Sequence, residues 1–307
     1  MERRAVLISG PTCSGKTTLS ILLAEILGTE IISADSRQIY KYLNIGTAKP
    51  TRKELGRIKH HFVDYIEPDE EYNASRFEFD SLAVISTLQS KGKIPVITGG
   101  SGLYIKSIVD GILDVVSKDD EYRINLLNLR RLYGNEHLYK MLIEVDPVSA
   151  DKMLPQNWKR IIRALEVHKL SGKPIWQLQN EYKRDVEINF IQFGLLWERS
   201  LLYERINKRV DNMISNGLVD EVKSIINKGY SSELNSLNTV GYKEVISYLK
   251  NDIDFDDMVN LIKRNSRRYA KRQLTWFRND NRIHWLEISN DMELEGLTEK
   301  ILSIIYP

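Results

Sequence analysis

The 307 residues are enough to bury the core of one large domain with an insertion, or of two domains. Hydrophobic residues make up 42% and charged residues 28% of the chain, as in a globular protein, and a net charge of +2 means that any nucleic-acid surface must come from local clustering of basic residues. The single cysteine, Cys13, excludes an internal disulfide and a cysteine-rich zinc site.

The first motif is a glycine loop between a strand and a helix. The apolar run Ala5–Ile8 predicts a strand, Gly10–Thr17 reads G-x-x-x-x-G-K-T, and apolar residues at helical spacing continue to Gly28. The N–H groups of such a loop and the positive end of its helix bind phosphate oxygens. Lys16 is then expected to reach the terminal phosphate, and the Thr17 hydroxyl to ligate Mg²⁺. The alternative is a loop that has kept this shape without its ligand.

A second strand is predicted where the short apolar run after Glu30 ends in small and polar residues. It places Asp35 and Ser36 at its carboxyl end, and ligands bind at that end of a parallel α/β sheet. A carboxylate there can accept a proton or hold Mg²⁺ through water; the alternative is a cap for the following turn. We favour the functional interpretation because of the position. A short strand is expected within His60–Ile66.

A third strand and a second glycine loop follow a helix predicted over Ala74–Ser90. The strand, Ile94–Thr98, is apolar throughout, as a buried parallel strand should be. It opens into Gly99–Tyr104, whose small residues would let a substrate approach the backbone. No acidic residue ends this strand, although an ordinary P-loop ATPase carries one there to hold its metal.

From about residue 115 to residue 188 the pattern changes to charged helices with short turns. The expected helices are Asp119–Leu132, His137–Val145, one that starts at Asp146-Pro147 and stops at Pro155, and Trp158–Leu170, closed by Gly172. The last of them carries Lys159, Arg160 and Arg163. Such a basic cluster is usually a solvated surface, and the cluster alone favours that interpretation.

The strand pattern returns at Phe190–Trp197, and the helix after it carries Arg205 and Arg209. Either arginine could reach a phosphate from a helix that begins at the ligand edge, and either could simply be solvated. The polar turn Asn238–Lys243 precedes another helix. A long helix over Val259–Arg278 is dense in basic residues beside aromatic ones, which fits an RNA backbone track.

A last strand, Arg282–Glu287, and a closing helix, Leu294–Ile305, end the chain. We therefore predict an α/β fold with a P-loop NTPase-like parallel sheet. Its catalytic core is expected to comprise residues 1–114 and 189–307, with a helical insertion over residues 115–188.

Seven segments together resemble the bacterial tRNA dimethylallyltransferases, also called tRNA isopentenyltransferases or the IPP transferase family. They occur in the family's order and span nearly the whole chain: Gly10–Thr17, Asp35–Tyr40, Ile45–Pro50, Gly99–Tyr104, Arg160–Glu166, Val240–Tyr242 and Ala270–Trp276. The first is shared with many families. The segments I-G-T-A-K-P and K-R-Q-L-T-W are far more specific.

The resemblance implies transfer of a dimethylallyl group from dimethylallyl diphosphate to N6 of the adenosine 3′-adjacent to the tRNA anticodon, with release of diphosphate. It implies catalytic roles for Lys16, Thr17, Arg209 and Asp35, the last as general base, with Mg²⁺ as cofactor on Thr17. The implied diphosphate-binding residues are Gly10, Pro11, Thr12, Cys13, Ser14, Gly15, Lys16 and Thr17. The implied tRNA-binding residues are Asp35, Ser36, Arg37, Gln38, Lys49, Ser101, Arg123, Lys159, Arg160, Arg163, Gly241, Tyr242, Lys243, Lys271 and Arg272.

Two other functions fit part of the pattern. A P-loop small-molecule kinase would also have an aspartate after its second strand, with Trp158–Leu170 as a lid whose Arg160 and Arg163 clamp ATP. An RNA-binding module with a vestigial phosphate loop is the other. The partners we expect are the anticodon stem-loop of tRNA and dimethylallyl diphosphate, with no membrane. Because no signal peptide or membrane-spanning run is visible, we expect a soluble, cytoplasmic protein, and we expect a monomer.

Overall fold

The structure is a computed structural model that describes residues 3–113, 118–182 and 187–306. It divides into two compact units. The first comprises Met1–Asp110 with Glu187–Pro307, and the second is Gly111–Val186. The insertion expected from the sequence covers residues 115–188, close to the bounds of the second unit.

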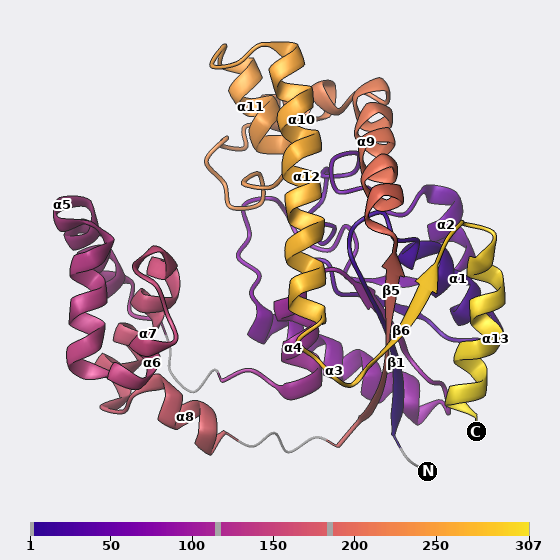
Figure 1. The fold of residues 1–307 in the computed structure, drawn as a ribbon, viewed down its shortest axis with the longest axis horizontal. Helices are drawn as coiled ribbons and strands as arrows, with labels where there is room; N and C mark the ends of the chain where they lie inside the picture. Colours follow the sequence, from indigo (N-terminus) through magenta and orange to yellow (C-terminus); the bar gives the residue numbers. More distant parts are fainter. Residues whose placement is uncertain (1–2, 114–117, 183–186, 307) are drawn as a thin grey trace. The chain divides into compact units, whose positions relative to one another are not determined.

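The first unit is built on a six-stranded sheet in which every neighbouring pair is parallel (Figure 1). Its order is β3-β2-β4-β1-β5-β6, where the strands are β1 (Arg4–Ser9), β2 (Ile31–Ser33), β3 (His60–His61), β4 (Val96–Gly99), β5 (Asn189–Trp197) and β6 (Ile283–Ile288). The expected parallel α/β sheet is confirmed. Strand β3 is shorter than predicted because the chain turns at Phe62 and Asp64, whose φ angles are +62° and +53°.

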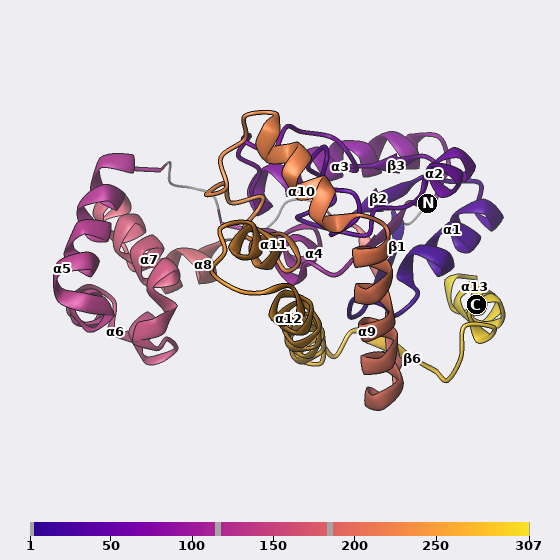
Figure 2. The same ribbon diagram turned by 90° about the horizontal axis from the view of Figure 1, so that it is seen from above.

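Helices cover both faces of this sheet. Those of the first unit are α1 (Lys16–Ile26), α2 (Arg52–Arg57), α3 (Ala74–Ser90), α4 (Gly102–Asp110), α9 (Arg199–Ser215), α10 (Leu218–Asn227), α11 (Tyr242–Leu249), α12 (Phe255–Phe277) and α13 (Glu293–Ile305). Figure 2 shows α1 and α13 on one face, with α3, α4 and α12 on the other. The short α2 and the helix α10 were not predicted.

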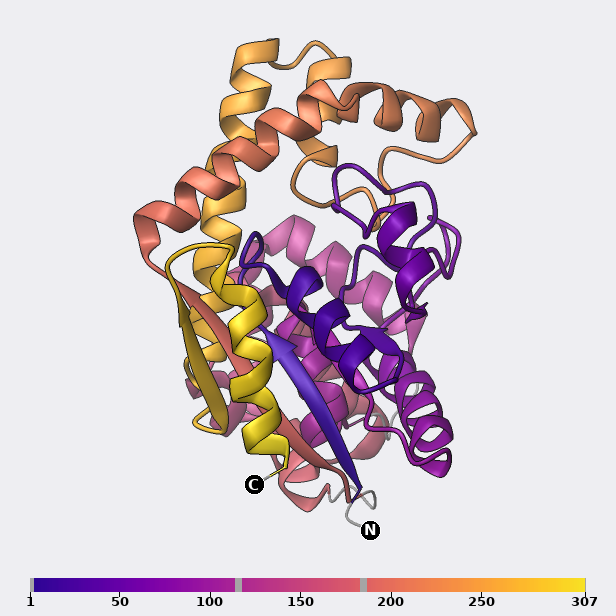
Figure 3. The same ribbon diagram turned by 90° about the vertical axis from the view of Figure 1, so that its right-hand side faces the viewer.

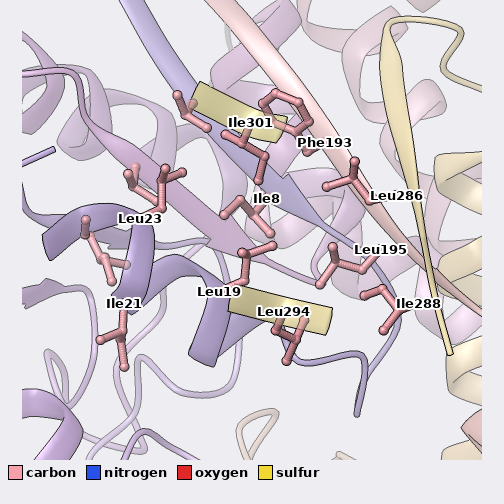
Figure 4. Packing of buried hydrophobic residues seen from close by; sticks show 14 of the residues in the cluster. Ile8, Leu19, Ile21, Leu23, Phe193, Leu195, Leu286, Ile288, Leu294 and Ile301 are labelled. Atoms are coloured by element: carbon pink, nitrogen blue, oxygen red, sulfur yellow. The ribbon is translucent and has the colours of Figure 1, made fainter. Parts of the chain in front are cut away.

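The core of the first unit lies between the central strands and the helices α1 and α13 (Figures 3 and 4). Ile8 and Phe193 on adjacent strands pack with Leu19 of α1 and Ile301 of α13, and all four are fully buried. Burial of such side chains is the main favourable term in folding. The C-terminal helix therefore completes the layer that supports the first glycine loop.

The second unit is helical. It contains α5 (Asp120–Val145), α6 (Pro147–Asp151), a 3₁₀ turn (Pro155–Asn157), α7 (Trp158–Ser171) and α8 (Ile175–Glu181). Gly134, at φ +81°, breaks α5 into two helical segments, as the sequence predicted. Gly172 ends α7 in the left-handed conformation, also as predicted, whereas α8 was missed. The unit has its own core, which includes Leu126, Leu142 and Ile161.

Among the residues that the structure describes, no helix has both the length and the apolar character that a membrane span needs.

Candidate active site

A cavity of about 510 Å³ lies in the first unit at the carboxyl ends of the strands. Its lining combines the first glycine loop, the segment after β2 and residues of α9 and α12. Figure 1 shows α9, α10 and α11 beyond this end of the sheet. The volume is that of an ordinary small-molecule site, and its position agrees with the ligand edge expected from the sequence.

Three left-handed residues curl the first glycine loop into a cradle. Gly10, Cys13 and Gly15 have φ angles of +146°, +66° and +89°. The Ser14 carbonyl accepts a 3.0 Å hydrogen bond from the Trp197 indole N–H, and the Cys13 carbonyl accepts one of 2.9 Å from Nε of Arg205. These bonds engage two carbonyl oxygens that would otherwise repel an anion bound to the loop. The site is therefore suited to phosphate oxygens.

Lys16 lies at the positive end of this cradle. Its Nζ donates a 2.6 Å hydrogen bond to the Pro11 carbonyl. Burial lowers the pKa of Lys16 to about 8; the Asp35 carboxylate opposes this shift, and the Arg209 guanidinium adds to it. An anion bound in the cradle would favour the charged form of Lys16.

Asp35 follows β2 and lines the cavity with Lys16 and Thr17. Its Oδ1 accepts backbone hydrogen bonds from Arg37 at 2.8 Å and Gln38 at 3.2 Å. The carboxylate therefore caps the following turn, as one interpretation expected, and it also lines the cavity, where the functional interpretation requires it to be. The turn holds the carboxylate in one orientation, which is what a positioned proton acceptor requires.

The two candidate arginines of α9 have different surroundings. Arg205 stacks on the Trp197 ring at 4.1 Å and forms a 2.5 Å ion pair with Asp291. Arg209 donates from Nη1 to the Thr12 hydroxyl at 3.1 Å and from Nη2 to the Thr47 carbonyl at 3.4 Å. No carboxylate of the described residues forms an ion pair with Arg209. Of the two arginines, Arg209 is therefore the one whose charge is available to a bound anion.

Gln273 of α12 joins the two glycine loops, a role that was not predicted from the sequence. Its Oε1 accepts the Thr12 N–H at 2.9 Å, and its Nε2 donates to the Gly100 carbonyl at 2.9 Å. A signal was present, since Gln273 lies at helical spacing from buried Ala270 and Phe277 and is itself only 6% exposed. A polar residue in such a stripe indicates a buried partner.

Tyr269, one turn before Gln273, also lines the cavity. Burial, together with the nearby Asp35 carboxylate, raises the pKa of Tyr269 to about 12, so its hydroxyl stays protonated and can donate.

Lys49 and Tyr242 are placed differently from the expectation of RNA contact. The Lys49 side chain is 3% exposed, pairs with Asp64 and donates to the Tyr40 carbonyl. Tyr242 is fully buried and donates to the Glu221 carboxylate at 2.6 Å. Both residues hold the loop Ile45–Pro50 in place. Correcting the expectation, we assign them a supporting role, because neither presents its polar group to the surface.

The other residues expected to contact tRNA in this unit gather around the cavity. The cavity lining includes Asp35, Ser36, Arg37, Gln38, Gly241, Lys243 and Arg272. Ser101 joins this group because its hydroxyl accepts the Ser36 N–H at 2.9 Å. Lys271 is exposed beside Arg272.

In the second unit, Arg123 and Arg163 converge on one buried carboxylate. Arg123 binds Glu166 through two hydrogen bonds of 2.6 and 2.8 Å, and Arg163 adds a third of 2.6 Å. Glu166 has no exposed surface. Burial would raise the pKa of Glu166, but the bonds from Arg123, the Asp119 N–H and Arg163 hold it below its ordinary value. Lys159 and Arg160 are exposed.

The residues around Thr17 fit a magnesium ion that is held mainly by a substrate. Among the described residues, no group of three histidine, cysteine or acidic side chains could form a protein-only metal site. Thr98 stands at the end of β4, where an ATPase has its acidic residue. The buried Thr98 and Ser14 hydroxyls have no hydrogen-bond partner in the described structure and line the same cavity. Magnesium commonly takes few protein oxygens together with phosphate oxygens and water.

Comparison with known proteins gives one family. Residues 38–280 match the sequence model described as IPP transferase. A tRNA dimethylallyltransferase of Finegoldia magna is 46% identical over 301 residues, covering 97% of this chain and 96% of that protein. The crystal structure of the full-length tRNA isopentenylpyrophosphate transferase from Bacillus halodurans has a TM-score of 0.72 at 36% identity, covering 99% of this chain and 96% of that one. A eukaryotic dimethylallyltransferase acting on tRNA has a TM-score of 0.84 at 27% identity, covering 98% and 78%.

Proposed function

This chain belongs to the IPP transferase family, and on that premise we propose that it transfers a dimethylallyl group from dimethylallyl diphosphate to N6 of the adenosine 3′-adjacent to the tRNA anticodon. The observation that carries the proposal is the single cavity that brings a cationic phosphate cradle, with Lys16 and Arg209, next to the oriented carboxylate of Asp35. The cradle can bind the departing diphosphate, and the Asp35 carboxylate can accept a proton.

The cradle assists the bond that breaks. When the allylic carbon leaves its oxygen, the electron pair stays with the diphosphate, and negative charge builds on its oxygens. The loop N–H groups, the Lys16 ammonium and the Arg209 guanidinium stabilise that charge, and each such donor is worth roughly 10²-fold in rate. A magnesium ion on the Thr17 hydroxyl would supply further neutralisation of the diphosphate.

Asp35 assists the bond that forms. The exocyclic amine of adenine is a weak nucleophile, and it must lose a proton as the new carbon–nitrogen bond forms. The Asp35 carboxylate, held through Oδ1 by the N–H groups of Arg37 and Gln38, accepts that proton. The target base must leave its stack to reach a carboxylate inside a cavity.

The basic residues are proposed to hold the RNA. Arg37, Lys243 and Arg272 line the cavity, and Lys271, the chain neighbour of Arg272, is exposed. Lys159 and Arg160 of the helical unit supply further exposed positive charge. Each set would bind phosphates of the anticodon stem-loop, and the single-stranded loop would enter the cavity of the first unit. We propose that the protein acts in the cytoplasm as a monomer.

The kinase alternative is disfavoured by Thr98, which occupies the place of the metal-holding acid of an ordinary P-loop ATPase. The test is to incubate the protein with Mg²⁺, unmodified tRNA and dimethylallyl diphosphate labelled in its allyl group. We expect the label in tRNA. Phosphoryl transfer from ATP to a small acceptor without label in tRNA would overturn the proposal, as would tight tRNA binding without any turnover.

A further inference from the structure

We infer that Gln273 is a positioning residue that sets the geometry of the diphosphate cradle relative to the general base. This inference rests on the proposed function. Gln273 comes from α12, far along the chain from both loops that it joins, and its side chain is almost completely buried at 6% exposure. Gln273 also lines the cavity, but its amide oxygen and nitrogen are bonded to the two loops, and we infer that it acts through them.

The Gln273 amide bonds to two loops, one of which presents a hydrogen-bond donor and the other an acceptor. The Thr12 N–H needs an acceptor and finds Oε1 at 2.9 Å, while the Gly100 carbonyl needs a donor and finds Nε2 at 2.9 Å. A neutral amide offers both functions in one plane. A carboxylate could accept but not donate, and an aliphatic side chain of similar size could do neither. The two bonds therefore need a side chain that both accepts and donates, as the Gln273 amide does.

The packing around Gln273 leaves little freedom. A Cβ atom on Gly100 would collide with Nε2 of Gln273, and a Cβ atom on Gly102 would collide with the Trp276 indole. One turn of α12 is thus seated against the second glycine loop. Ala270 and Phe277, which flank this turn, are buried and anchor the helix. Close packing of this kind restricts the amide to one orientation.

The consequence reaches both chemical ends of the site. On one side, the bond to Gln273 turns the Thr12 N–H toward the helix, while the Thr12 hydroxyl receives Nη1 of Arg209. On the other side, the loop held through Gly100 carries Ser101, whose hydroxyl accepts the Ser36 N–H next to Asp35. Gln273 therefore sets the spacing between the leaving-group cradle and the proton acceptor. Misplacement of reacting groups by about 1 Å can cost roughly 10²-fold in rate.

The first test compares two identical substitutions at different places. Gln273→Leu removes both bonds, and Gln89→Leu is the matched control, because Gln89 also donates from Nε2 to a backbone carbonyl, that of Arg4, outside the cavity lining. We expect Gln273→Leu to lower kcat for dimethylallyl transfer by about 10- to 100-fold, with the tRNA Kd within about threefold of the unsubstituted protein. Gln89→Leu should keep kcat. Thermal unfolding of both variants checks that they are folded.

A second variant, Gln273→Glu, tests the inference if Gln273→Leu does not fold. The carboxyl group introduced by Gln273→Glu accepts and donates like the amide when protonated, but only accepts when ionised. Other charged or titratable residues line the same cavity and also influence the introduced carboxyl group: Lys16, Asp35, Arg209 and Arg272. To remove their contribution to the pH dependence, kcat of the variant is divided by kcat of the unsubstituted protein at each pH. Between about pH 9 and 5 that ratio should rise as the pH falls.

The inference would be overturned in favour of a structural role if Gln273→Leu lowered the melting temperature but left kcat unchanged. It would also be overturned if the kcat ratio of Gln273→Glu to the unsubstituted protein did not change with pH. Failure of the proposed function looks different, because the unsubstituted protein would then put no label into tRNA. Binding of dimethylallyl diphosphate with Mg²⁺, measured by calorimetry on the same variants, should weaken for Gln273→Leu and not for Gln89→Leu.

Discussion

The hydroxyl of Tyr242 donates a 2.6 Å hydrogen bond to Glu221, whose carboxylate also accepts the backbone N–H groups of Asn44, Ile45 and Gly46. Burial and the neighbouring carboxylate raise the pKa of Tyr242 well above its ordinary value, so the hydroxyl remains a donor. The loop held in this way continues directly into the residue whose carbonyl receives Arg209. Two helices outside the sheet, α10 and α11, therefore shape the loop that steers the arginine.

This arrangement predicts unequal effects for two conservative substitutions. Tyr242→Phe removes one buried hydrogen bond and should lower the free energy of unfolding by about 1 kcal/mol. Glu221→Gln places an amide against several N–H donors and should cost more, about 2 to 3 kcal/mol. Denaturant unfolding measures both, with Tyr133→Phe as a control at an exposed tyrosine. Equal effects of the two variants would mean that the carboxylate does not hold the loop.

Asp35→Asn separates proton transfer from phosphate binding. Asparagine keeps an oxygen for the N–H groups of Arg37 and Gln38, so the turn should persist, but the side chain can no longer take up a proton. We expect kcat to fall by about 10²- to 10⁴-fold, with the Kd for dimethylallyl diphosphate changed only a few fold. Single-turnover kinetics and calorimetry give the two numbers. A parallel loss of diphosphate affinity would instead make Asp35 an organiser of metal or phosphate.

The lowered pKa of Lys16 predicts proton uptake on binding. Below about pH 8 the free ammonium is already charged, whereas above it the group is largely neutral. A bound diphosphate favours the charged form, so binding near pH 9 should take up a proton, binding near pH 7 should take up less, and affinity should fall as the pH rises through about 8. Calorimetry in buffers of different ionisation enthalpy measures the uptake, which Lys16→Met should abolish.

The lowered pKa of Lys16 also affects stability, but the free energy of unfolding should rise with pH where the affinity for diphosphate falls. Between about pH 8 and the ordinary value of 10.5, the unfolded chain keeps the Lys16 proton that the folded chain has released. Because the unfolded state binds more protons, the contribution of Lys16 to the free energy of unfolding rises with pH across this window. Comparison with Lys16→Met isolates this term. A pH-independent difference between the two proteins would show that the pKa is not lowered.

Two arginines of α7 should respond differently to truncation. Arg163→Ala removes a bond to the buried Glu166 and should cost about 1.5 to 3 kcal/mol of stability. Arg160→Ala changes an exposed residue and should leave stability nearly unchanged. If Arg160 contacts an RNA phosphate, its loss reduces the salt dependence of tRNA binding by about one unit of slope. A salt slope that does not change in Arg160→Ala would remove this residue from the RNA contacts.

Much of the fold was readable from local patterns. The strand before Gly10, the glycine loop and the helix after it are neighbours in the chain, so their spacing alone predicts a phosphate cradle. Asp35 was found in the same way, because a short apolar run ends just before it and parallel strands present their carboxyl ends to ligands. The end of the helix before Gly172 was marked by the residue that tolerates a left-handed conformation.

Contacts between distant parts of the chain were not readable. Thr12 and Gln273 are 261 positions apart, and no local pattern records a hydrogen bond between them. The same holds for the different surroundings of the two arginines, because Arg205 pairs with Asp291 and Arg209 bonds to Thr12. Lys49 and Tyr242 were assigned to RNA by motif, yet burial turned them inward.

Local sequence thus specifies backbone conformation and the ends of the elements, because these depend on neighbouring residues. The order of the strands, and the side chains that meet above them, follow from long-range packing. Which side chains line the cavity and which are bonded to other parts of the chain was therefore decided by the tertiary structure.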